Sequence, residues 1–414
     1  MSRTAAREGY DAEVLQMPQR GECTHAHALF KLTYAMECGA CRRVPAEPLL
    51  HDWRSPDLDR TKLGGSDFWL HKPFTDIVVQ GSAFAPDGRP VESMQIGIEL
   101  GKAHKDVLVT GRRDIAWSGG RPHLSRPQPF DSMPITWQNA YGGIDWRVAV
   151  PGADACAASG IPELALRTRL DHPGMYPRNP FGTGYLVVPG EVPGLTAPTI
   201  EDPVDRLTDD RLITGDPTRW WRQPLPWCLD WTSPIMFPRA CWFSPEVDPW
   251  FPAPDDATLP EVARSVISAG FSRTRCPDGG VDPRFFQGAS AGLVVGRLAG
   301  GQLMTITGMH PEHHRLQVVL PATQAEITFT IEGRQVLQPA RLHHLVCRPN
   351  DLRLTLVFAA EAALPRPFIP GIHRHIPVSA SFNGDHPVPY LAPVPVNDRV
   401  AAAQAASTAT KDGP

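Results

Sequence analysis

Hydrophobic and polar residues alternate with a period of two along several stretches of the chain, which is the pattern of β-strands. In residues 27–36, HALFKLTYAM, one face of the predicted strand carries four large side chains: Phe30, Leu32, Tyr34 and Met36. Residues 76–101, DIVVQGSAFAPDGRPVESMQIGIELG, predict two strands around the turn APDGRP, and residues 106–117, DVLVTGRRDIAW, predict another hairpin-like pair. We therefore expect a sheet in the N-terminal part of the chain.

The C-terminal part alternates more regularly. The stretches that show this pattern are residues 296–309, 314–321, 325–336 and 352–358. They predict a run of antiparallel strands. A single amphipathic helix is predicted before them at residues 259–271, LPEVARSVISAGF, where the apolar residues have helical spacing and Gly270 supplies the stop.

The middle of the chain, from about Ser118 to Thr258, alternates little and is rich in proline, glycine and tryptophan. The chain has 45 prolines in 414 residues, about twice the usual share, and proline interrupts both helices and central strands. Nine of the 11 tryptophans fall between Trp117 and Trp250, an aromatic content that a disordered segment does not carry. The predicted fold is mainly β, with antiparallel, sandwich-like sheets, long ordered loops and one or a few short helices.

The length suggests two or three domains. We predict an N-terminal extension (1–26), an N-terminal β domain with Trp-rich loops (27–258), a C-terminal antiparallel β domain (259–398) and a disordered, low-complexity tail (399–414).

Charge and hydropathy narrow the classes of partner. The net charge is −4 and both signs are mixed along the chain, so no clustered positive surface is predicted for nucleic acid. No apolar run reaches membrane-spanning length and the N-terminal residues have no apolar signal core, so we expect a cytoplasmic protein that does not enter membranes. The eight cysteines are then expected to be thiols.

One cluster has metal-ligand residue types. Cys23, His25, Cys38 and Cys41 surround a predicted strand, and four such ligands can hold zinc tetrahedrally. Their spacing fits no standard zinc finger, and a turn that uses Gly39 for its backbone explains the sequence ECGAC better. We favour plain thiols and expect no cofactor, with zinc as the alternative.

Other candidates for chemistry are weaker. His310, His313 and His314 lie in a loop between two predicted strands. Adjacent acids occur at Glu201–Asp202, Asp209–Asp210 and Asp255–Asp256, whereas a glycosidase needs two carboxylates that face each other across a cleft. No phosphate-binding loop, zinc-protease motif or dinucleotide fingerprint is present. These motif classes therefore give no indication of an enzyme.

Five other segments, in this order along the chain, carry sequence motifs of a different kind: SDFWLHKPFTDIVVQG, MPITWQNAYGG, NPFGTG, IEDP and DPRFFQGA. In this order and spacing, roughly from His27 to Pro365, the chain resembles the bacterial family catalogued as domain of unknown function 2169. The residues that match the family motifs, with the neighbouring Arg178, are Ser66, Asp67, Lys72, Pro73, Asp76, Gly81, Met133, Pro134, Tyr141, Gly142, Gly143, Asn179, Pro180, Gly182, Gly184, Glu201, Asp202 and Pro203.

The resemblance implies a non-enzymatic adaptor or chaperone of type VI secretion, which helps to load a toxic effector onto the spike and PAAR-type proteins at the tip of the tube. The loop YPRNPFGTGY, residues 176–185, then has a predicted role in holding shape: prolines fix φ, glycines permit positive φ, and Asn179 caps its own turn. Two alternatives stay open, a cell-wall or carbohydrate hydrolase that uses Glu201 and Asp202, and a structural component associated with the spike.

The chain departs from the family pattern between about Trp220 and Arg239, and near its last predicted strand, where VFAAEA replaces an expected tryptophan. We predict that Trp220, Trp221, Trp227 and Trp231 contact the effector, because interface anchors are often tryptophans. The competing interpretation is that these four side chains are core residues.

Overall fold

The computed structural model describes residues 11–16, 23–37, 39–49, 67, 72–149, 172–176, 179–191, 194–215, 223–231, 287–290, 292–298, 300–368, 376–382 and 388–389. The protein is mainly β, as predicted, and the described residues contain no helix of seven residues or more. They also contain no helix long and apolar enough to cross a membrane.

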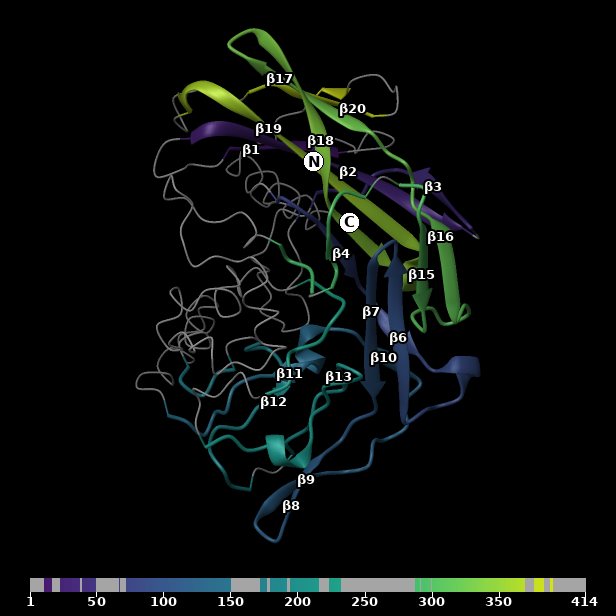
Figure 1. Ribbon diagram of the computed structural model, residues 1–414, viewed down its shortest axis with the longest axis vertical. Helices are drawn as coiled ribbons and strands as arrows, with labels where there is room; N and C mark the ends of the chain where they lie inside the picture. Colours follow the sequence, from purple (N-terminus) through teal and green to yellow (C-terminus); the bar gives the residue numbers. More distant parts are fainter. Residues whose placement is uncertain are drawn as a thin grey trace, which may run out of the picture.

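The largest sheet has ten strands and forms the upper part of the molecule in Figure 1. Its main path runs β1 (Asp11–Gln16), β2 (Cys23–Glu37), β19 (Arg353–Phe368), β18 (Arg334–Arg348), β17 (Ala325–Ile331), β20 (Val378–Phe382) and β21 (Val388–Pro389). Three further strands join it: β3 (Ala40–Val44) beside β2, β4 (Thr75–Val79) beside β18, and β14 (Val294–Val295) beside β4. All pairs are antiparallel except β4 with β18, which is parallel.

A second, five-stranded sheet lies below the first. Its order is β13 (Ile200–Glu201), β7 (Ala103–Thr110), β6 (Ser93–Leu100), β15 (Leu303–Thr307) and β16 (Arg315–Val319). Three two-stranded pairs complete the lower part: β5 (Ser82–Phe84) with β10 (Ser132–Pro134), β8 (Ile115–Ser118) with β9 (Arg121–Leu124), and β11 (Tyr141–Gly142) with β12 (Thr183–Gly184). Short 3-10 turns lie at η1 (Pro86–Gly88), η2 (Trp137–Asn139), η3 (Asp209–Arg211) and η7 (Pro349–Asp351).

Most predicted strands are present, but some predicted pairings are wrong. The strand at residues 27–36 lies within β2, and the C-terminal alternations form β15 to β19. Residues 76–101 form three strands, β4, β5 and β6, that pair elsewhere. Residues 106–117 are divided between β7 and β8, which belong to different sheets, so neither stretch is a hairpin.

Both large sheets contain strands from each side of residue 258, where the sequence predicted a domain boundary. β4 pairs with β18 and β2 with β19 in the first sheet, and β6 pairs with β15 in the second. The predicted helix at 259–271 and the predicted tail at 399–414 lie outside the described residues.

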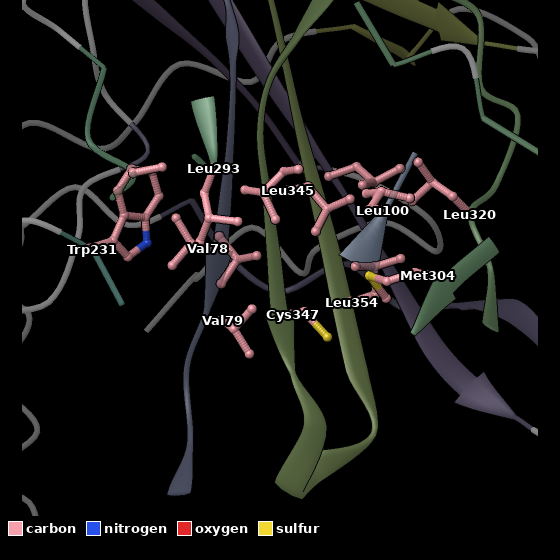
Figure 2. Packing of buried hydrophobic residues seen from close by; sticks show 14 of the residues in the cluster. Val78, Val79, Leu100, Trp231, Leu293, Met304, Leu320, Leu345, Cys347 and Leu354 are labelled. Carbon is pink, nitrogen blue, oxygen red and sulfur yellow. The ribbon is translucent and has the colours of Figure 1, made fainter. Parts of the chain in front are cut away.

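One hydrophobic core joins the two sheets. Figure 2 shows part of it as a row of side chains: Trp231, Leu293, Val78, Val79, Leu345, Cys347, Leu354, Leu100, Met304 and Leu320. All five residues of β4, TDIVV, are buried, because neighbouring segments cover both of its faces and both of its edges. β4 is therefore the strand around which the candidate site is built.

Candidate functional site

The first family motif forms a buried ion pair at the start of β4. Lys72 Nζ lies 2.5 Å from Asp76 Oδ2, and neither side chain reaches solvent. The same carboxylate accepts hydrogen bonds from Gln287 Nε2 at 2.8 Å and from the backbone N–H of Gly288 at 2.7 Å. Buried charge is stable only when it is paired and hydrogen-bonded, and Asp76 meets both conditions.

A second buried ion pair lies beside the first. Lys31 of β2 pairs with the carboxylate of Asp67, whose Oδ1 lies 3.0 Å from His344 Nε2 of β18. Burial alone would raise the pKa of Asp67, but the hydrogen bond from His344 and the charge of Lys31 outweigh it and lower the pKa to about 2. Burial, helped by the charge of Lys72, lowers the pKa of His344 to about 4. At neutral pH His344 is therefore an uncharged donor to an ionised Asp67.

Trp231 joins these two pairs. Lys72 Nζ lies 4.9 Å from the centroid of its ring, and the His344 ring meets it edge to face at 4.8 Å. Gly288 packs against the same indole so closely that a Cβ at this position would come within 2.9 Å of it. The exposed fraction of Trp231 is 3%, so it is a core residue. This supports the core interpretation for Trp231 and not the predicted effector contact.

Trp231 is the last described residue of a largely buried segment, residues 223–231, that contacts several motif elements. Near its start, Tyr141 donates its hydroxyl to Gln223 Oε1 at 2.8 Å, and Tyr176 donates to the carbonyl of Pro224 at 3.1 Å. The phenol hydroxyls of two motif loops thus fix one end of the segment.

The rest of the segment is attached to β4, β7 and η2. Val79 of β4 donates its N–H to the carbonyl of Leu229 at 2.9 Å, and Trp137 Nε1 donates to the carbonyl of Asp230 at 3.1 Å. Trp227 Nε1 donates to the carbonyl of Asp106 at 2.6 Å, while Lys105 Nζ lies 3.1 Å from the Trp227 ring centroid. Trp227 is only partly buried, and Trp220 and Trp221 lie outside the described residues.

The Tyr-Gly-Gly and Asn-Pro motifs pack directly on each other. β11 and β12 pair in parallel, with Gly142 opposite Gly184. The buried Asn179 donates through Nδ2 to the carbonyls of Trp137 at 2.7 Å and Tyr141 at 3.2 Å. This geometry supports the predicted shape-holding role of the loop. The predicted cap by Asn179 is different, because its described side-chain hydrogen bonds run to the other motif and none of them closes its own turn.

Glycine is required where these two motifs meet. Gly142 has φ +146°, and a Cβ there would lie 2.1 Å from the carbonyl oxygen of Asn179. A Cβ on Gly143 or Gly182 would lie within 2.5 Å of a backbone oxygen. The rings of Tyr141, Tyr176 and Tyr185 form one cluster above this contact, with centroids 5.0 to 6.3 Å apart. The two motifs therefore form one packed unit.

Glu201 is also held inside the protein. It forms an ion pair with Arg113 through Oε1, and its Oε2 accepts the N–H of Leu207 at 2.7 Å. Asp202 caps an exposed turn by accepting the N–H of Val204 at 2.9 Å. Both oxygens of Glu201 are thus engaged internally, and this arrangement does not favour the hydrolase alternative.

The remaining motif residues have supporting positions. Met133 and Pro134 lie in β10, where the carbonyl of Pro134 accepts Asn139 Nδ2 at 2.8 Å. Pro73 precedes β4, Pro180 is buried in the turn after Asn179, and Gly81 follows β4. Ser66 and Arg178 lie outside the described residues.

The predicted metal ligands are not all close to one another. Cys41 pairs with Met36 near one end of β2, and His25 lies eleven positions earlier on the same strand, about 36 Å away at 3.3 Å per residue. These two residues cannot bind one metal ion. Cys38 and the side chain of Cys23 lie outside the described residues, within which no group of three His, Cys, Asp or Glu side chains could hold a metal. Burial raises the pKa of Cys41 to about 11, as for an unreactive thiol.

His310 and Asp209, two other candidate residues from the sequence, form hydrogen bonds that hold loops in place. The Nδ1 atom of His310 accepts the N–H groups of Glu312 and His313, both at 3.1 Å. Asp209 accepts the N–H of Leu124 at 2.9 Å and lies 3.1 Å from His123. Asp255 and Asp256 lie outside the described residues.

Sequence reasoning missed one exposed feature that follows the Tyr-Gly-Gly motif. The buried carboxylate of Asp145 accepts both Nε and Nη2 of Arg147 at 2.8 Å and the N–H groups of Val187 and Val188. Burial acts against this charge, but these hydrogen bonds lower the pKa of Asp145 to about 2. Trp146, between them, has an exposed fraction of 57%, and Val188 one of 40%. An acidic residue two positions before an arginine was the available signal.

Together, these contacts define a β-rich protein whose motif residues build its interior and hold the segment 223–231 in place. The chain belongs to the family described as "Uncharacterized protein conserved in bacteria (DUF2169)", whose model matches residues 22–359. This match confirms the resemblance read from the motifs. No curated protein and no solved structure shows significant similarity to the chain.

Proposed function

We propose that this protein is a non-enzymatic adaptor that binds a toxic effector and brings it to the spike and PAAR-type tip proteins of a type VI secretion system. One observation carries the proposal: apart from Asp202, which caps an exposed turn, the charged motif residues that the structure describes are engaged with internal partners. Lys72 pairs with Asp76, and Glu201 pairs with Arg113. Charges used in this way set the shape of a protein, which suits a binding scaffold.

A binding scaffold also needs an anchor on its surface. Trp146 is suited to this role, because interface hot spots are enriched in tryptophan and a rigid side chain loses little entropy on binding. Its turn is closed by the N–H of Val148, which donates to the carbonyl of Asp145 at 3.2 Å. Arg147 Nη1 donates to the carbonyl of Gly190 at 3.1 Å and fastens the same turn to the next loop. We therefore place the effector contact at Trp146 and Val188.

The test is co-expression of the tagged protein with the effector and tip proteins encoded by neighbouring genes, followed by pull-down and measurement of affinity. We expect the wild-type chain to capture one effector and one tip protein. Trp146→Ala should weaken effector binding by about 30-fold, the effect of losing a hot spot of about 2 kcal/mol. Its melting temperature should change little because the indole is mostly exposed.

Leu337→Ala is the matched control, since Leu337 of β18 has the same exposed fraction of 57%. This variant should bind like the wild type. Capture of no neighbour-encoded effector by the wild-type chain would overturn the adaptor proposal. Normal capture by Trp146→Ala would remove Trp146 from it and leave the adaptor role standing.

A further inference from the structure

Three polar atoms at one edge of the five-stranded sheet are buried and have no hydrogen-bond partner among the described residues. They are Thr110 Oγ1 of β7, Thr199 Oγ1 immediately before β13, and Arg113 Nε. Thr110 has an exposed fraction of 5% and Arg113 one of 9%, so bulk water does not reach these groups freely. A buried polar group without a partner costs free energy, and such groups usually bind an ordered water molecule or an ion.

The pairing of β7 with β13 places the two hydroxyl-bearing residues opposite each other. The strands are antiparallel, with Glu201 opposite Leu108. Two positions away, Thr110 donates its backbone N–H to the carbonyl of Thr199 at 2.8 Å. Side chains two positions apart in a strand point to the same face, so Thr110, Thr199 and Glu201 share one face of the sheet. Residues directly opposite each other have Cβ atoms roughly 5 Å apart, a separation that one small molecule can bridge.

Arg113 closes over this face. Its Nη2 donates to the carbonyl of Pro198 at 2.7 Å and pairs with the carboxylate of Glu201. These two partners lie on either side of Thr199 in the sequence, so the guanidinium group lies over the chain at this residue. The guanidinium is planar and rigid, and its Nε–H donor is therefore held close to the two threonine side chains.

We propose that the two threonine hydroxyls and the Nε–H of Arg113 form a binding site for one ordered water molecule. Water accepts the Nε–H and can donate to or accept from each hydroxyl, which gives the three hydrogen bonds typical of an internal water. An ion of either sign is disfavoured, because a cation would meet the guanidinium of Arg113 and an anion would meet the carboxylate of Glu201. This site does not depend on the adaptor role.

The water has a structural consequence for the Glu-Asp-Pro motif. Arg113 and the N–H of Leu207 engage the two oxygens of Glu201, the first residue of that motif. A water bound to Nε holds the guanidinium on the side that neither Pro198 nor Glu201 contacts. The same molecule bonds to β7 through Thr110, so it fastens the Arg113–Glu201 pair to the sheet.

The first test uses the sign of a stability change. Thr110→Val replaces the hydroxyl by a methyl group of similar size, and urea unfolding measures the result. Loss of a hydrogen bond to the water should lower the folding constant about fivefold. A hydroxyl without any partner predicts the reverse, because its removal relieves a buried unsatisfied group. Thr328→Val, at a half-buried position of β17, corrects for the intrinsic difference between the two residues in a strand. A corrected folding constant equal to or above that of the wild type would overturn the proposal.

The second test locates the water in the wild-type protein and so does not depend on a variant that folds. A high-resolution crystal structure should show one water within hydrogen-bonding distance of Thr110 Oγ1, Thr199 Oγ1 and Arg113 Nε. A direct bond between the two hydroxyls, an ion at this position or the lack of any density there would refute the site. In solution, the Nε–H of Arg113 should show a nuclear Overhauser effect to water with the sign of an immobilised molecule. Arg112 is the control, because its Nε donates to Asp114 at 3.0 Å on the surface and should show only exchange with bulk water. The same behaviour for both arginines would contradict the proposal.

Discussion

The ammonium group of Lys72 and the carboxylate of Asp76 lie 2.5 Å apart in the interior of the protein, with neither side chain exposed. Around this pair the structure brings together β4, the residues at 287–288 and Trp231 at the end of the segment 223–231. Segments far apart in the sequence therefore depend on one ion pair for their relative positions.

We predict that Lys72→Met destabilises the protein by about 3–5 kcal/mol, because it leaves the carboxylate of Asp76 buried without its cation. The double variant Lys72→Met/Asp76→Leu should be less destabilised than Lys72→Met, since it leaves no buried charge behind. Urea unfolding monitored by tryptophan fluorescence measures both. Arg42→Met is the control: Arg42 pairs with Glu37 on the surface, so its loss should cost at most about 1 kcal/mol. A double variant no more stable than Lys72→Met would contradict this explanation.

Strand β2 shows which features of the structure the sequence pattern can predict and which it cannot. Alternation of Phe30 and Leu32 with smaller or polar residues predicted a strand with one buried face. The structure buries Lys31 as well, because Asp67, which is distant in the sequence, supplies its counter-charge. Periodicity reports which face is apolar, but it cannot report a charge partner brought in by the tertiary fold.

Glycine positions give a second prediction. Gly142→Ala should lower the melting temperature by more than 10 °C or prevent folding, because the new Cβ would meet the carbonyl oxygen of Asn179 at 2.1 Å. Gly119→Ala is the matched control: its φ is also positive, at +57°, but no atom lies within 4 Å of the new Cβ. It should cost only about 1 kcal/mol, the usual penalty for this backbone conformation. Similar melting temperatures for the two variants would mean that the contact between the two motifs is not required for stability.

Acid titration gives a third prediction. The pKa of His344 is lowered from 6.5 to about 4 in the folded protein, so its contribution to stability is complete above pH 6.5 and is lost as the pH falls through 4. This contribution is about 3 kcal/mol. Nitrogen-15 NMR at pH 7 should show a neutral imidazole protonated on Nε2, the atom that faces Asp67. A midpoint near 6.5 for this ring would refute the prediction.

The segment 223–231 shows most clearly that local sequence composition does not determine whether a residue is buried or exposed. Its tryptophans and its departure from the family pattern suggested an effector-binding surface, since local composition does not distinguish a buried aromatic residue from an exposed one. The structure buries Trp231 between Lys72 and His344, which lie 159 positions before it (231 − 72) and 113 after it (344 − 231). Trp146 was not predicted, because its exposure depends on a turn closed by Asp145 and Arg147.

The last prediction tests whether the tyrosine loops hold the segment 223–231. Tyr141→Phe removes the hydroxyl that donates to Gln223 Oε1, so it should destabilise the protein by about 1–3 kcal/mol through an unsatisfied buried acceptor. Gln223→Leu should cost a similar amount, because it leaves the Tyr141 hydroxyl without its acceptor. In the double variant both groups are gone and the cost should fall short of the sum by about 1 kcal/mol or more, as for residues in contact. Urea unfolding of the four proteins measures this coupling. Tyr176→Phe combined with Gln223→Leu is the control cycle, since Tyr176 donates instead to the backbone of Pro224. Purely additive effects for Tyr141 and Gln223 would show that their hydrogen bond does not hold the segment.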